Sequence, residues 1–456
     1  MKKAILIILI SGLFTGLGTA QKLMDIYKNG PVKLIAEKSY GSNNSWATLF
    51  NLYYDTLTKN VGREEDKKIV VAQDGSVFMS HRNRFDIWKF GPDGNYLKKI
   101  GGKGGKPEQF SKMPTIYPIV DGKYLIASGD VTGRIKFFDL DGILFKSYTF
   151  NYTTGNFQSF GKGEILFEGN IMLKSETYLP PGSMELSNGW RHIIVSLNLY
   201  TGKEKTIYEV TKKENSYFSK PPSTDSSKRI SPTVNRIYLP NYIVFKAPVF
   251  TILKDGRFIQ SNRETGEVKV LNESGKEIRN FRLDITPEAI TEKDALEHYE
   301  TTKKMLLKTR EQANAMRDIP ETKVVGNTVT MYKSYPDKKE ILARTEKTLS
   351  KIEGLKNLDG YFPHLPYFSN IILDDEGNLL VFEFTSQEQK ESNIFNVIAY
   401  DSNGQKLART SFISDEYDLS FSESTFVISK GYVYAVAKLK NFNGMPLRLV
   451  KFKISN

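Results

Sequence analysis

The chain of 456 residues contains no cysteine and only four histidines. Without cysteine, no disulfide can stabilise the fold, and no lipid can be attached at a cysteine behind an export signal. None of the histidines stands in the HxH, HxxxH or HExxH spacing of a metal site. The sequence also lacks a GxSxG motif for a serine nucleophile. We therefore expect no metal centre and no cofactor. The four histidines are His81, His192, His298 and His364.

Long apolar runs are also absent, except at the N-terminus, which reads MKKAILIILISGLFTGLGTAQ. Lys2 and Lys3 supply positive charge, a short apolar run follows, and Gly18-Thr19-Ala20 supplies small residues, as in a cleavable signal peptide. The run is short for a membrane span, so we expect cleavage after Ala20; an uncleaved anchor is the alternative. Residues 21–456 are then expected as one domain, periplasmic or secreted, with no stable membrane insertion.

One motif recurs along the chain: an apolar stretch, a tight turn that ends in glycine, and a second apolar stretch. Asp-Gly between such stretches is a strong hairpin signal, because glycine accepts a positive φ without steric cost. A second series of glycine turns follows the first at offsets of 19, 20 and 19 residues in three repeats. Each repeat is therefore predicted as four strands, with one glycine turn in each of its two hairpins. The first series is Gly75, Gly122, Gly163, Gly256, Gly377 and Gly431; the second is Gly94, Gly142, Gly202, Gly275 and Gly404.

The sixth repeat lacks a fourth strand at the C-terminus, and an unmatched apolar stretch, Pro31–Ser42, stands at the other end of the chain. If this stretch pairs with Leu447–Ile454, both termini build the last sheet and a ring closes. Closure protects the edges of a repeat array. We therefore predict an all-β fold, a six-bladed β-propeller, each repeat forming one blade.

The glycine-dense run after the first repeat is predicted as a connector between blades. A phosphate-binding loop needs Ser or Thr after Gly-Lys and a helix beyond it, but here Pro107 follows Lys106. The stretch KFGPDGNYLKKIGGKGGKPEQFSKMPTI resembles the NHL-type repeat, although this chain has only one clear Gly-rich connector. FPHLPYFSNIILDDEGNLLVFEF resembles the six-bladed, NHL- and TolB-like propellers exported by Bacteroidetes-type bacteria. These families include binders, lactonase-like enzymes and lyases, so the resemblance implies a fold rather than an activity.

The long irregular segments are predicted to lie on one face of the ring, where the second-to-third-strand loops and the connectors between blades meet. They are residues 174–190, 211–239, 286–366 and 385–392. Within the largest, residues 291–317 and 337–354 have helical periodicity, and Thr291 with Asp294 favours a helix start. We expect a helical hairpin at about 287–356, between blades four and five. It would act as a lid, as a docking arm or as a buttress.

Polar residues in or beside the turns of this face are the candidate binding residues. They are His81, Arg82 and Arg84 in blade one, Asp130 and Arg134 in blade two, and Asn262 and Arg263 in blade four. Such a cationic, hydrogen-bonding group suits carboxylate or sugar oxygens; ordinary polar turns are the alternative. In the blade-three loop, Tyr178 and Trp190 would stack on a sugar or pin the loop.

Two hypotheses about function follow. The first is a non-catalytic binding protein that takes an anionic small molecule, a glycan, a peptide or a protein on the elaborated face. The alternative is a propeller-type hydrolase or lyase at the axial pocket, which would need several acidic or His side chains converging in a concave site. The export signal argues against a nucleic-acid partner. The net charge of +12 fits an anionic partner or a charge spread over a large surface.

Overall fold

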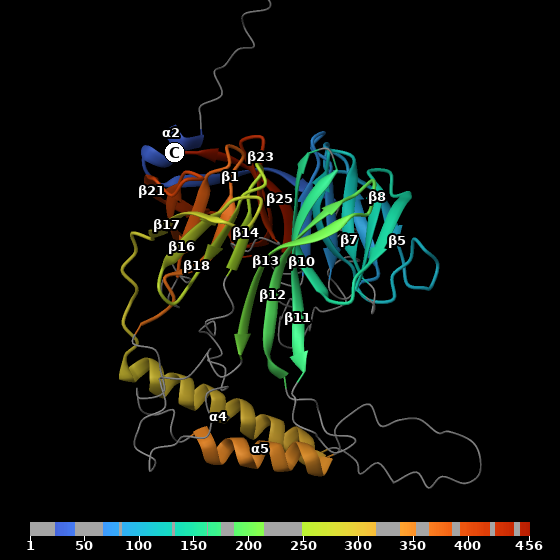
Figure 1. Cartoon of the computed structure of the whole chain (residues 1–456). Coiled ribbons are helices and arrows are strands. Elements are labelled where there is room, and N and C mark those ends of the chain that lie inside the picture. Colours follow the sequence, from blue (N-terminus) through green and yellow to red (C-terminus); the bar gives the residue numbers. More distant parts are fainter. Residues whose placement is uncertain are drawn as a thin grey trace, which may run out of the picture.

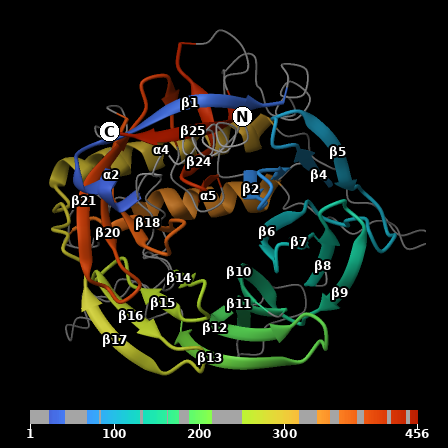
Figure 2. The same ribbon diagram turned by 90° about the horizontal axis from the view of Figure 1, so that it is seen from above.

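The structure, a computed structural model, describes most of the chain as antiparallel β-sheet with few helices. The sheets follow one another in a ring, which is the architecture of an all-β propeller (Figure 2). The predicted signal peptide, Arg82, Asp130 and Tyr178 lie outside the described residues. The described residues are 23–41, 67–81, 84–129, 133–161, 163–174, 187–213, 249–315, 338–352, 364–384, 393–419, 425–441 and 447–456.

Four of the sheets contain four strands each, paired in chain order. The first has β2 (Lys67–Val71), β3 (Val77–His81), β4 (Asp86–Phe90) and β5 (Tyr96–Gly101). The second has β6 (Thr115–Val120), β7 (Tyr124–Ser128), β8 (Arg134–Asp139) and β9 (Leu144–Thr149). The third has β10 (Thr153–Gly161), β11 (Glu164–Lys174), β12 (Ser187–Asn198) and β13 (Glu204–Lys213). The fourth has β14 (Val249–Ile252), β15 (Phe258–Ser261), β16 (Glu267–Leu271) and β17 (Glu277–Arg282).

The remaining strands form one nine-stranded sheet. The predicted pairing of the two chain ends is confirmed, because β1 lies antiparallel to β25, with Leu34 opposite Ile454. Strand β1 also pairs in parallel with β21, Val32 lying opposite Phe412, and this joins the last two predicted repeats. The strands are β1 (Val32–Tyr40), β18 (Phe368–Leu373), β19 (Leu379–Glu383), β20 (Ile394–Tyr400), β21 (Lys406–Ile413), β22 (Tyr417–Asp418), β23 (Phe426–Ser429), β24 (Tyr432–Leu439) and β25 (Leu447–Ser455).

The predicted turn glycines of both series all have φ between 67° and 88°, so the hairpin prediction is confirmed. Glycines of the second series also lie against the outer strand of the preceding unit. A Cβ at Gly275 would lie 2.2 Å from the carbonyl oxygen of Ile207 in β13. A Cβ at Gly404 would lie 2.3 Å from the Phe281 ring in β17. The remaining contacts of this kind are Gly94 with Lys38, Gly142 with Ile100 and Gly202 with Tyr148.

Buried apolar side chains fill the spaces between consecutive four-stranded units. Between the second and third sheets, for example, Phe137 of β8 packs in one cluster with Phe157, Phe167 and Ile193. Six such clusters occur among the described strands. Burial of a large apolar side chain stabilises the fold by about 1.5–3 kcal/mol, so these seams are the main source of stability.

The glycine-dense run is a folded connector between β5 and β6, as predicted. Phe110 is fully buried between the first two sheets, and its N–H donates to the Gly102 carbonyl at 2.8 Å. Gly101 has a φ of 79°, and a Cβ there would lie 2.3 Å from the Phe110 ring. The buried Lys136 ammonium lies 4.8 Å from the centre of that ring. The glycines therefore let the connector pass close to its own aromatic anchor.

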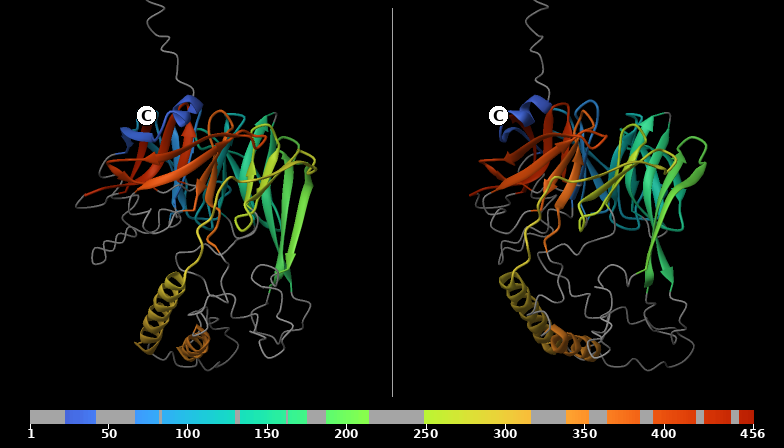
Figure 3. Two further views of the ribbon diagram at one scale, coloured as in Figure 1. Left: turned by 90° about the vertical axis from the view of Figure 1, so that its left-hand side faces the viewer. Right: turned by 60° about the vertical axis from the view of Figure 1, so that its left-hand side comes forward.

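Two helices, α4 (Glu292–Ala315) and α5 (Lys338–Ile352), lie between β17 and β18 in the chain and on one side of the ring (Figures 1 and 3). The predicted cap is present: the Asp294 carboxylate accepts hydrogen bonds from the N–H and hydroxyl of Thr291, at 2.8 and 2.6 Å. Tyr299 and Ile352 are buried where the helices meet, as the periodicity predicted.

A short helix that the sequence reading missed, α2 (Leu23–Lys28), lies on the opposite side of the ring (Figure 1). Its buried Leu23 and Tyr27 pack into the cluster between β18–β21 and β23–β25. The side-chain amide of Asn456 donates to the Ile26 carbonyl at 2.8 Å, so both ends of the described chain meet here. None of the described helices has the length and apolarity needed to cross a membrane.

Candidate functional site

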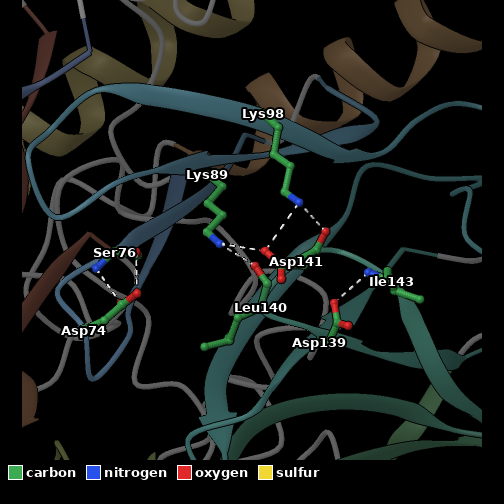
Figure 4. Close-up of polar contacts among 8 residues, drawn as sticks. All are labelled: Asp74, Ser76, Lys89, Lys98, Asp139, Leu140, Asp141 and Ile143. Atoms are coloured by element: carbon green, nitrogen blue, oxygen red, sulfur yellow. Dashed lines mark hydrogen bonds and ion pairs between the residues drawn. The ribbon is translucent and has the colours of Figure 1, made fainter.

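The face that carries the tight turns is closed by hydrogen bonds between neighbouring sheets. In the seam between the first and second sheets, Lys89 Nζ donates to the Leu140 carbonyl at 2.7 Å (Figure 4). Lys98 donates to the Asp141 carbonyl next to it. The hydrogen bond and charge of Lys89, with the charge of Lys98, hold the pKa of the Asp141 carboxyl below its usual value. Asp139 accepts from the Ile143 N–H at 2.8 Å, which fixes the turn itself.

The opposite face carries the two long helices and the ends of the longest strands. Helices α4 and α5 lie there, and the long strands β11, β12 and β13 extend toward them beyond the ring (Figure 1). These strands have 11, 12 and 10 residues, whereas β7, β8 and β9 of the preceding sheet have five or six. We call this side the insertion face and the extended part of β11 and β12 the ribbon.

A pocket opens on the insertion face at the neck, where the chain leaves β17 for α4 and returns to β18. The two neck segments touch: the Leu365 N–H donates to the Glu288 carbonyl at 2.7 Å, and Ala289 forms a β-bridge with His364. The pocket is thus bounded by both neck segments and by the end of β19. Its lining consists of Ile285, Thr286, Pro287, Glu288, Leu365, Pro366, Tyr367, Glu383 and Phe384.

Two of the polar groups that line this neck pocket are bonded to arginines of the fold. Arg409 Nε donates to the Glu383 carboxylate at 3.1 Å, and this hydrogen bond, with the Glu383 charge, raises the pKa of Arg409. Arg282 donates to the Tyr367 hydroxyl. Glu288 is exposed at the rim. The pocket is small, with a cavity volume of about 40 Å³, and most of its surface is polar. The Glu383 carboxylate and the Tyr367 hydroxyl are held in place by the arginines behind them.

A second polar group lies on the inner strands. The Tyr117 ring lies between the Lys68 ammonium, 4.0 Å from the ring centre, and the Phe157 ring, with centroids 4.5 Å apart. The Tyr117 and Ser128 hydroxyls are hydrogen-bonded at 3.3 Å. Burial raises the pKa of Tyr117, and the nearby negative charge of Glu168 adds to that shift. Tyr117 is thus a neutral side chain that packs with residues of the sheets on either side of its own.

Glu168 of β11 and His192 of β12 lie on the same face of the third sheet. The Glu168 Oε1 and His192 Nδ1 atoms are 3.7 Å apart, and the two side chains are 13% and 9% exposed. The distance is within ion-pair reach but too long for a hydrogen bond. His192 Nδ1 is buried and has no hydrogen-bond partner among the described residues.

The described candidate residues of blades one and two are integrated into the fold. His81 ends β3 and is 2% exposed. Arg84 Nε donates to Asp86 at 2.7 Å, and its guanidinium carbon lies 5.1 Å from the centre of the Trp88 ring. Arg134 begins β8 and is half-buried. These contacts agree with the alternative interpretation of polar turns that stabilise the sheets.

The candidates of blades three and four also contact the fold. Asn262 accepts a hydrogen bond from the Glu264 N–H at 2.8 Å and so closes its own turn. Arg263 donates to the Ser369 carbonyl at 2.6 Å and ties the fourth sheet to β18. Trp190 corrects the sequence reading: it lies within β12, paired with Met172, and not in a loop, because the strands run longer than the apolar pattern indicated.

The sequence reading missed the neck pocket and the Glu168–His192 pair. A signal for the pocket was present, since Pro287 and Pro366 flank the helical segment in the sequence. No local signal marks the pair, whose members are 24 residues apart and meet only through strand register. In the part of the chain that the structure describes, no group of three or more His, Asp or Glu side chains is placed to hold a metal ion.

No family model and no curated protein matches the chain. A solved DUF4221 family member from Bacteroides vulgatus is 13% identical, with a TM-score of 0.44 and coverage of 94% of this chain and 100% of its own. A candidate exported protein from Bacteroides fragilis is 10% identical, with a TM-score of 0.40 and coverage of 86% and 96%. A streptogramin B lyase is 9% identical, with a TM-score of 0.36 and coverage of 86% and 84%. Similarity at this level assigns neither a family nor an activity to the chain.

Proposed function

We propose that the chain is an exported six-bladed β-propeller that binds a ligand on its insertion face without catalysing a reaction. In this proposal residues 21–456 form one domain, and α4 and α5 form a helical hairpin inserted between blades four and five. Three features support six blades: the pairing of β1 with β25, the six apolar clusters between units, and the seating of second-series turns on the preceding unit. The extreme N-terminal sequence supports export.

The neck pocket carries the proposal of binding. It lies on the face with the helices and the ribbon, and it presents Glu288, Glu383 and Thr286 as hydrogen-bond acceptors. Carboxylates at a pocket repel an anion and accept hydrogen bonds from hydroxyl or amide groups. The ligand class that fits is therefore a neutral, hydrogen-bond-donating segment of a glycan or a peptide, and not the anionic small molecule considered from the sequence.

The polar groups favour binding over catalysis. Among the described residues that line the pocket, the titratable groups are Glu288, Tyr367 and Glu383. Two of these three, Tyr367 and Glu383, accept hydrogen bonds from arginines, so their oxygens are already engaged within the fold. The Glu168–His192 pair is buried in the third sheet and does not line the pocket. An acid–base pair facing a substrate, which the hydrolase or lyase alternative requires, is not found among these lining residues.

The first test is a screen of the mature protein against immobilised glycans and peptides, followed by titration of the hits against variants. Phe384→Ala and Glu288→Gln alter the pocket, and each is expected to weaken binding about tenfold, the loss of about 1.4 kcal/mol. Glu273→Gln is the matched control, because Glu273 is an exposed glutamate in the turn between β16 and β17, on the other face. Equal losses in all three variants, or a hit turned over into a product, would contradict the proposal.

The second test removes the helical hairpin. The Glu288 carbonyl and the Leu365 N–H are already hydrogen-bonded, so a short Gly-Ser turn can replace residues 289–364 without moving the blades. We expect this shortened protein to fold with an unchanged β-sheet circular dichroism spectrum. Retention of ligand affinity would place the recognition in the pocket walls. A loss of affinity with intact folding would place it on the hairpin.

A further inference from the structure

The Glu168–His192 pair lies where the ribbon leaves the third sheet. Glu168 is opposite Ile194 in the register, and His192 is two residues from Ile194, so the two side chains are diagonal neighbours on one sheet face. Leu166 and Ile194 of the same face pack in the cluster that joins the third and fourth sheets. The pair therefore lies at the end of an apolar seam, where its charges are weakly screened.

Some other ionisable groups among the described residues lie near the pair. On β13, Tyr208 lies on the same face, and its hydroxyl donates to Gln260 at 2.8 Å. Lys269 of β16 is within electrostatic reach of Tyr208. On β14, residues 249–252 carry no titratable side chain. Arg191 and Glu209 form an ion pair with each other at 3.3 Å and belong to the opposite face of the sheet. Tyr117 of β6 is within electrostatic reach of Glu168. Among the described residues, Glu168 is thus the charged group within ion-pair distance of His192.

We propose that Glu168 and His192 form a pH-sensitive latch at the root of the ribbon. With a neutral imidazole, His192 Nδ1 remains without a hydrogen bond, 3.7 Å from the carboxylate. When the imidazole takes up a proton, both ring nitrogens carry hydrogen, and Nδ1–H donates to Glu168 as one member of a buried ion pair. Carboxylates lose their charge in stronger acid than imidazolium ions need to form, so in mild acid both charges are present. The proton comes from solvent and no bond other than N–H is formed.

The direction of the pH dependence follows from the charge that His192 carries when it is protonated. The ion pair stabilises the folded ribbon only while His192 is protonated, so its stabilisation is present in acid and is lost as the pH rises and the imidazole gives up its proton. The latch would tighten the insertion face in an acidic medium and loosen it at neutral pH. It does not rest on the proposed ligand site and can hold whether or not the neck pocket binds a ligand.

A double-mutant cycle at two pH values tests the latch. The variants are His192→Gln, Glu168→Gln and the double variant, and urea unfolding is measured at pH 5.5 and pH 8. We expect the coupling between the two positions to favour folding more strongly at pH 5.5 than at pH 8, by a factor of about ten in the folding equilibrium constant. This is within the range measured for contacting residues. Equal coupling at both values would overturn the proposal.

A second measurement on the intact chain keeps the test decisive if a variant does not fold. The chain has only four histidines, so its imidazole NMR spectrum is simple enough to assign from single substitutions. The His192 ring signals should change from the neutral to the doubly protonated pattern between pH 8 and pH 5.5. The protection of the backbone amides of residues 170–174 in β11 against hydrogen exchange should rise as the pH falls over the same range. A ring that stays neutral at pH 5.5, or protection that does not change, would refute the latch.

Discussion

Replacement of Gly275 by alanine tests how the blades are held against one another. Gly275 has a φ of 83°, and an alanine Cβ there would lie 2.2 Å from the carbonyl oxygen of Ile207. A side chain in this left-handed region costs about 1–2 kcal/mol. The contact adds a packing cost of about 1–3 kcal/mol, because the neighbour is backbone of β13 and cannot rotate away. We therefore expect Gly275→Ala to lower the free energy of unfolding by about 2–5 kcal/mol.

Gly377 supplies the matched control. It has nearly the same φ, 82°, but no atom lies within 4 Å of the position that a Cβ would take. Gly377→Ala should therefore lose only the backbone term of about 1–2 kcal/mol. Urea unfolding followed by circular dichroism measures both variants, with the dependence on urea used to check that the same surface unfolds. If Gly275→Ala loses no more stability than Gly377→Ala, the turn between β16 and β17 is not seated on the preceding sheet and the reasoning fails.

Two further predictions concern buried polar groups. Thr302→Val should stabilise α4 and α5 by about 1 kcal/mol in thermal unfolding, because the buried Thr302 hydroxyl has no described hydrogen-bond partner. Thr345→Val is the control: it removes a 2.8 Å hydrogen bond to the Ile341 carbonyl and should not stabilise the helices. Burial raises the pKa of Asp86, but the hydrogen bond and charge of Arg84 outweigh it and the net pKa is lowered. The stabilisation by this ion pair is then present above about pH 3.9 and is lost as the pH falls below it. Asp86→Asn should therefore be less stable than the natural protein at pH 7, and the difference in stability should become smaller toward pH 2. A difference that does not change with pH would contradict this.

The strand order could be predicted because its determinants are local. An Asp-Gly turn between alternating apolar stretches fixes a hairpin within about a dozen residues, and the helix start at Thr291 and Asp294 is a contact across three residues. The pairing of β1 with β25 spans almost the whole chain, yet it followed from counting strands. By contrast, α2 carries too short a pattern to be recognised, and its burial depends on a seam that forms only in the closed ring.

The candidate site was harder to predict, because polar residues in turns are commonly used to hold the turns. Arg84, Asn262 and Arg263 have the composition of a ligand site, but each contacts its own sheet or the next one. The Glu168–His192 pair arises only from the register of β11 with β12. A one-residue change of register would turn one partner to the other face of the sheet, so no property of either residue alone reveals the pair.

The second glycine series shows how one residue type can serve a local and a distant requirement at once. The sequence reading used only the local reason, that a tight turn needs a positive φ, and this reason alone is sufficient at Gly377 and Gly431, which have open space around them. At Gly275 and Gly404 the missing side chain also makes room for the preceding unit. Because that unit lies a full repeat earlier in the chain, the same glycine closes a hairpin and sets the distance between two sheets.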